Sequence, residues 1–121
     1  MRFHGFSESE HDIELQIGFY LRTKKIFFWK NQTTGYFDPD RKIFRKQSSP
    51  YAINGSPDYI LIIGGRFVGF EVKTEKGRQS DSQKIFEEKL REAGGFYFII
   101  RSIEDAEKAL QALNKELGLE S

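Results

Sequence analysis

The feature that most constrains the fold is an apolar hairpin in the middle of the chain. Residues 59–63 are rich in β-branched and aromatic side chains, and a second run of this kind spans residues 67–72. Gly64 and Gly65 stand between the two runs and permit the positive φ angles of a two-residue turn. The pattern therefore predicts two adjacent antiparallel strands, with the start of the first opposite the end of the second.

This pairing brings ionisable side chains to one end of the hairpin. Asp58 directly precedes the first strand, and Glu71 and Lys73 share a face of the second because side chains alternate along a strand. Two carboxylates held a few ångströms apart repel each other, and a divalent cation with oxygen ligands offsets that repulsion. The residues therefore predict a metal site with a lysine beside it.

The alternative for Glu71 and Lys73 is a cross-strand ion pair on an exposed face, which contributes well under ~1 kcal/mol. The upstream Asp58 and the apolar hairpin favour the site. A second acid-x-lysine triplet, at residues 87–89, lies in an amphipathic helical stretch, and we interpret it as a solvated helix face.

Length and composition indicate one domain spanning residues 1–121. The chain has no cysteine, which excludes a disulfide framework or a thiolate metal site and is typical of a reducing compartment. No apolar run approaches the roughly 18 residues of a membrane span, and residues 1–5 lead into acids rather than an apolar signal core. We expect a soluble cytoplasmic protein that does not enter a membrane.

The distribution of charge along the chain is more informative about a binding partner than the net charge. The net charge is only +1, but residues 22–78 contain twelve basic residues against five acids, two of which are the expected metal ligands. The surface around the site should therefore be positive, which suits a polyanion such as DNA.

The remaining patterns predict the order α-β-β-β-α-β-α without repeats. Helices are expected at residues 8–24, 81–93 and 102–117, and strands at 26–29, at the two hairpin segments and at 96–100. The strand at 96–100 is entirely apolar, so we expect it near the centre of the sheet.

Residues 31–56 are expected to form a long irregular connection. This segment interleaves aromatic residues with Arg41, Lys42, Arg45 and Lys46. It could be a flap that contacts DNA, or a surface loop whose aromatic rings cover the core or a dimer seam, and the sequence leaves both open.

Two further polar residues fall on apolar helix faces. Glu10 lies one turn before Ile13, close to the axis of the inward stripe, so its carboxylate should point toward the site. The alternative is that it only complements the helix dipole. Gln83 falls with Phe86 and Leu90 beside the hairpin, where a buried amide needs partners and can serve the site or a structural hydrogen bond.

The order of these motifs resembles the VRR-NUC family of the PD-(D/E)xK nuclease superfamily, in particular its small stand-alone bacterial and phage forms. The resemblance covers nearly the whole chain and rests on Gly55-Ser56-Pro57-Asp58, the hairpin, Glu71-Val72-Lys73-Thr74, Lys76-Gly77-Arg78-Gln79-Ser80 and Gln83. Weaker matches are Ser9-Glu10, Phe28-Trp29-Lys30-Asn31, Ala93-Gly94-Gly95 and Arg101-Ser102. The resemblance implies an α/β fold with a restriction-endonuclease-like core, in which helices flank a mixed sheet. It also implies metal-dependent hydrolysis of phosphodiester bonds in the cytoplasm of a bacterium or a phage host.

The resemblance assigns roles to individual residues. It implies that Asp58, Glu71 and the backbone carbonyl of Val72 ligate Mg²⁺ or Mn²⁺, with Lys73 orienting the nucleophile or stabilising developing charge. Glu10 would act through water or a second ion, and Gln83 would position Lys73 or a phosphate. The candidates for DNA contact are Arg41, Lys42, Arg45, Lys46, Lys76 and Arg78.

Three functions are compatible with these residues. A nuclease for four-way junctions or other branched DNA ranks first, because the chain has no added module for reading sequence and resembles Holliday-junction resolvases. A general nickase or DNA-end nuclease is second, and a DNA-binding assembly module with an inactive site is the non-enzymatic alternative. Symmetric cleavage of a junction requires two equivalent sites, which favours a homodimer. The chain also has twelve phenylalanines, more than one small core needs, and those off the core face, such as Phe19 and Phe27, could form the interface. Those rings could instead complete the core or stack on unpaired bases.

Overall fold

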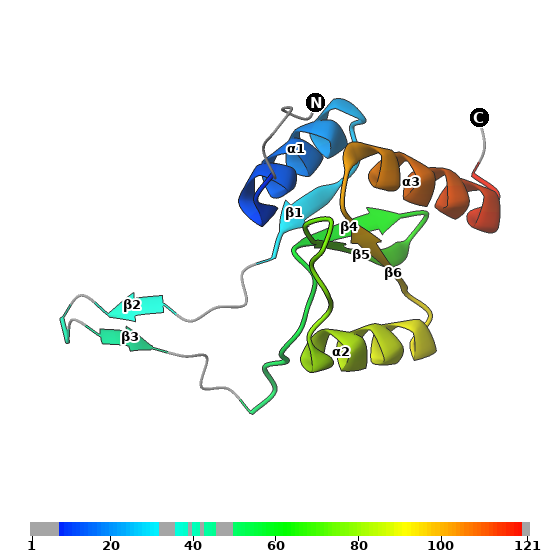
Figure 1. The fold of residues 1–121 in the computed structure, drawn as a ribbon. Helices are drawn as coiled ribbons and strands as arrows, with labels where there is room; N and C mark the ends of the chain where they lie inside the picture. Colours follow the sequence, from blue (N-terminus) through cyan, green and yellow to red (C-terminus); the bar gives the residue numbers. More distant parts are fainter. Residues whose placement is uncertain (1–7, 32–35, 39, 42, 46–49, 120–121) are drawn as a thin grey trace.

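The structure is a computed structural model that describes residues 8–31, 36–38, 40–41, 43–45 and 50–119. These residues form three helices and six strands (Figure 1). In chain order they are α1 (Glu10–Thr23), β1 (Phe28–Lys30), β2 (Tyr36–Asp38), β3 (Ile43–Arg45), β4 (Tyr59–Ile63), β5 (Arg66–Val72), α2 (Asp81–Glu92), β6 (Phe96–Ile100) and α3 (Ile103–Leu117). The fold class is α/β, as the sequence predicts.

A four-stranded mixed sheet forms the centre of the fold, in the order β1-β4-β5-β6. The pairs β1–β4 and β4–β5 are antiparallel, whereas β5 and β6 run parallel. The predicted hairpin is confirmed: β4 and β5 are joined by Gly64 and Gly65, whose φ angles are 58° and 77°. Its register pairs Tyr59 with Phe70, so the position before β4 falls beside Glu71.

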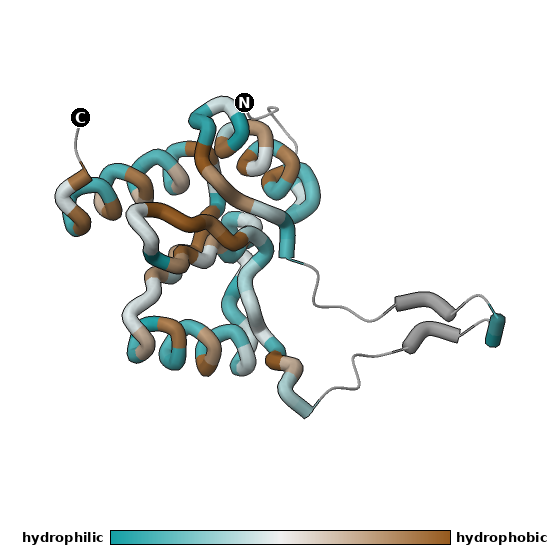
Figure 2. Tube along the Cα trace, turned by 180° about the vertical axis from the view of Figure 1, so that it is seen from behind, coloured by the Kyte–Doolittle hydropathy of each residue, from teal (hydrophilic) through white to brown (hydrophobic). Residues whose placement is uncertain are grey.

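Helices α1 and α3 cover one face of the sheet (Figure 1). The core between these layers joins α1 residues such as Ile17, α3 residues such as Leu113, and the β5 side chains Val68, Phe70 and Val72. The strands of the four-stranded sheet contain the most continuously hydrophobic stretches of the trace in Figure 2, whereas the helices alternate between hydrophobic and hydrophilic residues. This alternation is what burial of a single helix face requires.

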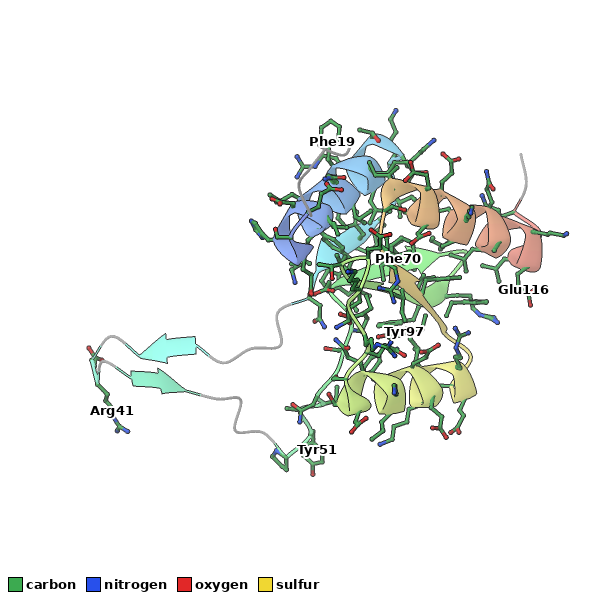
Figure 3. All side chains as sticks on the ribbon, viewed as in Figure 1. Phe19, Arg41, Tyr51, Phe70, Tyr97 and Glu116 are labelled. Atoms are coloured by element: carbon green, nitrogen blue, oxygen red, sulfur yellow. The ribbon has the colours of Figure 1, made fainter. Side chains whose placement is uncertain are left out.

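Helix α2 covers the opposite face. Its Phe86 ring contacts the ring of Tyr97 on β6, with centroids 6.4 Å apart. Tyr97 is almost fully buried between the sheet and α2 (Figure 3). The face that carries Gly69, Glu71 and Tyr97 is therefore a second interior, and it contains the polar residues of the hairpin.

Local signals explain where the helices begin and end. Serines at positions 9, 80 and 102 cap the three helices by accepting a backbone N–H with their hydroxyl oxygens. Helix α3 ends at Gly118, which adopts the left-handed conformation with a φ angle of 67°. Within the described residues, no helix has both the length and the apolar character needed to cross a bilayer.

Two predictions about the strands are wrong. The connection expected to be irregular contains β2 and β3, which pair antiparallel with each other and form a separate two-stranded sheet. These strands have three residues each, too few for an alternating pattern to stand out in the sequence. Strand β6 lies at an edge of the sheet rather than near its centre. Helices α2 and α3 cover its two faces, so its side chains are apolar on both sides. A strand in the centre of a sheet has the same apolar sequence, so the pattern alone does not tell the two positions apart.

Candidate metal centre

The candidate site lies where β4 begins and β5 ends. The side chains of Glu10, Asp58 and Glu71 each place a carboxylate oxygen within 4.8 Å of the other two. Glu10 is the first residue of α1, and the Ser9 cap fixes the position of that helix end. The structure therefore brings together three acids that are far apart in the sequence, all of them expected at the site.

Glu71 is the buried member of this group, with an exposed fraction of only 2%. Its Oε1 atom has no hydrogen-bond partner among the described residues. Burial, with the neighbouring Asp58 carboxylate adding to it, raises the pKa of Glu71 from 4.5 to about 8. Lys73 opposes this shift, with its Nζ 3.9 Å from Oε2 of Glu71. One ammonium group is therefore too little positive charge to keep Glu71 ionised near neutral pH.

Asp58 is held by the backbone of the neighbouring strand. Its Oδ2 accepts a hydrogen bond of 2.7 Å from the backbone N–H of Val72. Within a strand, the N–H and C=O groups of one residue point to the same side. The contact places the backbone of Val72 beside Asp58, and the role of the Val72 carbonyl as a third oxygen ligand stays a prediction.

Lys30 is a cation at this site that the sequence patterns did not assign to it. Its Nζ lies 3.7 Å from Oδ1 of Asp58 and 3.7 Å from Oε1 of Glu14. Lys30 ends β1, and β1 pairs with β4 so that Lys30 lies opposite Tyr59. Only this strand pairing reveals the contact, because nothing in the sequence around Lys30 specifies which strand β1 joins.

The turn before β4 is fixed from two sides. The Asn31 side-chain Nδ2 donates hydrogen bonds to Oγ of Ser56, at 2.6 Å, and to the carbonyl of Pro57, at 3.1 Å. Pro57 is buried against Gly69, where a Cβ atom would stand 2.6 Å from Cγ of the proline. The absent side chain at position 69 thus lets Pro57 pack on β5 and sets the position of Asp58.

The loop after β5 is held by Arg101, another residue to which the sequence patterns gave no role. Its Nη1 donates to the carbonyls of Thr74, Glu75 and Gly77 at 2.5, 3.2 and 2.7 Å. The exposed side chains of Lys76 and Arg78 project from this restrained loop. Two of the expected DNA-contact residues therefore extend from a fixed backbone next to Lys73.

Gln83 makes one of the two kinds of contact that the sequence leaves open for it. Its Oε1 accepts a 2.8 Å hydrogen bond from the backbone N–H of Ser80, and the Ser80 hydroxyl accepts in return from the N–H of Gln83. This reciprocal pair caps α2. Of the two alternatives open for this side chain, the structural hydrogen bond is the one observed, and the described contacts do not link Gln83 to Lys73.

The basic residues of the β2–β3 segment are only partly described. Arg41 is exposed at the tip of this hairpin, which extends away from the four-stranded sheet (Figure 3). Arg45 belongs to β3, whose side chains the structure does not describe, and Lys42 and Lys46 lie outside the described residues. The DNA-contact prediction for this segment stays a prediction.

The sequence matches no protein-family model and no curated protein. The functional argument therefore depends on the chemistry of the site. Three carboxylates and a backbone carbonyl are a hard oxygen donor set of the kind that Mg²⁺ and Mn²⁺ prefer. The unpartnered oxygen of Glu71 fits such an ion, because a buried carboxylate without a partner is costly unless positive charge neutralises it.

Proposed function

We propose that this protein is a nuclease that hydrolyses phosphodiester bonds in DNA and requires Mg²⁺ or Mn²⁺. The observation that supports the proposal is the convergence of Glu10, Asp58 and Glu71, with Lys73 beside them. A core of the PD-(D/E)xK type, as in the VRR-NUC family that the sequence resembles, accounts for this combination of residues at the end of a hairpin.

In this proposal, Asp58, Glu71 and the Val72 carbonyl hold the metal ion. When bound, the ion would supply a water of lowered pKa and would neutralise charge on the phosphate oxygens. Lys73 orients the attacking water or stabilises the charge that develops on the phosphate, since its ammonium group lies at the edge of the acid cluster. Glu10, the most exposed of the three acids, acts through water or a second ion.

DNA is the proposed substrate because cations surround the acids. Lys30 contacts Asp58, and Lys76 and Arg78 are exposed on the loop that follows the catalytic lysine. Lysine and arginine side chains around a metal site bind phosphates without regard to sequence. Branched DNA ranks first and a four-way junction is the preferred form, cut by two copies of the chain acting on opposed strands.

The test is a Mg²⁺ titration of cleavage over four-way junctions, nicked duplex and linear duplex of matched sequence, with Mn²⁺ and EDTA in parallel. We expect metal-dependent cleavage that is fastest on the junction, and loss of cleavage in Glu71→Gln. Glu88→Gln is the control, because Glu88 is the middle residue of the other acid-x-lysine triplet and is exposed on α2.

Equal cleavage of junction and linear duplex would replace the junction assignment with general nicking. DNA binding without cleavage at every metal concentration would contradict the nuclease proposal. That result would support the non-enzymatic alternative, a DNA-binding assembly module.

A further inference from the structure

Helix α1 carries a second apolar surface that the core does not use. Ile13, Ile17 and Leu21 face the core, but Leu15 and Phe19 are 58% and 70% exposed on the outer side of the helix. Phe19 points away from the body of the molecule in Figure 3. An aromatic ring this exposed buries little of its surface in the core.

This outer side of α1 forms one wall of a groove whose other wall is the edge of the sheet. Leu15, Phe19 and Arg22 line it from α1, and Phe28, Lys30 and Tyr59 line it from β1 and β4. The groove is open between them because position 18 is a glycine: a Cβ atom there would lie 2.6 Å from the hydroxyl oxygen of Tyr59. That hydroxyl donates to the Glu14 carbonyl at 2.8 Å, so the tyrosine ring is fixed in the floor.

The groove combines aromatic walls with positive charge. Arg22 and Lys30 are among its lining residues, none of which is acidic, and Lys30 shares its charge with the neighbouring carboxylates of Glu14 and Asp58. The lysine also connects the groove to the candidate metal centre, because its Nζ lies 3.7 Å from Oδ1 of Asp58. A molecule in the groove would therefore meet rings, cations and the acid cluster in succession.

We propose that this groove binds an unpaired nucleobase of DNA next to the phosphate that occupies the metal centre, an inference that rests on the proposed nuclease function. Base stacking on aromatic side chains combined with a positive groove is how single-stranded nucleic acid is bound without sequence preference. Phe19 stacks on the base, and Arg22 and Lys30 contact the adjoining phosphates. Unpaired nucleotides occur at branch points and strand ends, so the groove selects DNA that is open near the scissile bond.

A second copy of the chain is a less suitable occupant. A two-fold interface places the same patch of both copies against itself. The patch would then bring Arg22 of each copy to a surface that carries the same cation, and Lys30 is already paired with Glu14 and Asp58 of its own chain. The phosphates of DNA supply the negative charge that a second copy of this patch does not.

The experiment uses Trp29, the only tryptophan of the chain, which also lines the groove and is 43% exposed. Single-stranded oligothymidylate is titrated in EDTA while tryptophan fluorescence is recorded, with blunt duplex of the same length as comparison. We expect quenching that saturates at lower concentration with the single strand. Phe19→Ala should weaken single-strand binding about 5- to 150-fold, the effect of losing one stacked base, and Phe19→Tyr should restore it.

Ile85→Ala is the control, because Ile85 is comparably exposed but lies on α2. Unchanged single-strand affinity in Phe19→Ala would overturn the proposal. So would light scattering in which Phe19→Ala converts a dimer to a monomer, since the groove would then be an interface between copies. The EDTA measurement does not involve cleavage, so single-strand quenching in a protein that cleaves nothing would refute the nuclease function alone.

Discussion

Asp58 and Val72 are joined by a 2.7 Å hydrogen bond from the valine N–H to the aspartate carboxylate, across the end of the β4–β5 hairpin. This contact orients the carboxylate of Asp58 toward the strand that carries Glu71. It also uses only one of the two carboxylate oxygens of Asp58, and the other lies near Lys30. The geometry of the site is therefore set by strand pairing rather than by contacts within a loop.

Asp58→Ala and Lys73→Ala should each lower DNA cleavage at least ~10²-fold, which is the low end of what a positioned catalytic group contributes. DNA binding in EDTA should stay largely intact, because both variants keep the other cations that we propose contact the phosphates. Single-turnover cleavage and fluorescence anisotropy measure the two effects separately. Lys89→Ala, in the other acid-x-lysine triplet, is the control. Activity within a few-fold of wild type in either variant would remove that residue from the mechanism.

The metal-free protein should lose stability as the pH rises toward 8. Burial raises the pKa of Glu71 to about 8 from an ordinary 4.5, so between these pH values the folded state holds a proton that the unfolded state has released. The free energy of unfolding therefore falls with rising pH in this window. Glu71→Gln should remove the slope and be more stable than wild type at pH 8, by at least the ~1.4 kcal/mol of one pKa unit.

Urea unfolding in EDTA from pH 5 to 9 measures this difference. Adding Mg²⁺ at pH 8 should stabilise the wild type but not Glu71→Gln, because the ion replaces the proton on the carboxylate. A wild-type stability that does not vary over this range would mean that Glu71 ionises without cost.

Gly69→Ala should destabilise the protein by ~1–3 kcal/mol, the usual cost of an added group in a filled interior. The new Cβ would stand 2.6 Å from Cγ of Pro57, so the proline and the adjoining Asp58 must move. We expect cleavage to fall more than stability alone explains, measured at a temperature where the variant is fully folded. Gly65→Ala provides a contrast at a position with no atom within 4 Å of the added Cβ, although its positive φ strains the backbone.

The basic residues of the β2–β3 segment are tested by the salt dependence of DNA binding. Replacing Arg41, Lys42, Arg45 and Lys46 by glutamine should reduce the slope of log affinity against log salt by roughly 0.9 for each phosphate of duplex DNA that the variant no longer neutralises. An unchanged slope would assign the segment to packing or assembly and leave Lys76 and Arg78 as the residues that bind phosphate.

Symmetric cleavage of the two opposed strands of a junction predicts a homodimer. Light scattering at micromolar concentration, with and without junction DNA, should give twice the mass of one chain. A single-chain mass in both conditions would shift the function toward simple nicking. Phe19→Ala should leave the measured mass unchanged, because we propose that the Phe19 ring binds a nucleobase and does not contact the second copy.

Most of the fold could be predicted from local patterns. The hairpin, its glycine turn, the three helices and the apolar strand 96–100 each follow from residue type and periodicity. The convergence of Asp58 and Glu71 was predictable too, because a two-residue turn determines which residues of a hairpin are opposite each other. By contrast, strands β2 and β3 have three residues each, which is too short for an alternating pattern to stand out in the sequence.

The sequence by itself determined the alternation of helices and strands and the pairing across one tight turn, since both depend on residues close in the chain. Only the tertiary structure decided that Lys30 reaches Asp58 and that Arg101 holds the loop after Lys73. These contacts depend on which strands become neighbours and how helices pack across them. That choice is made by burial of the whole core, and no single segment specifies it.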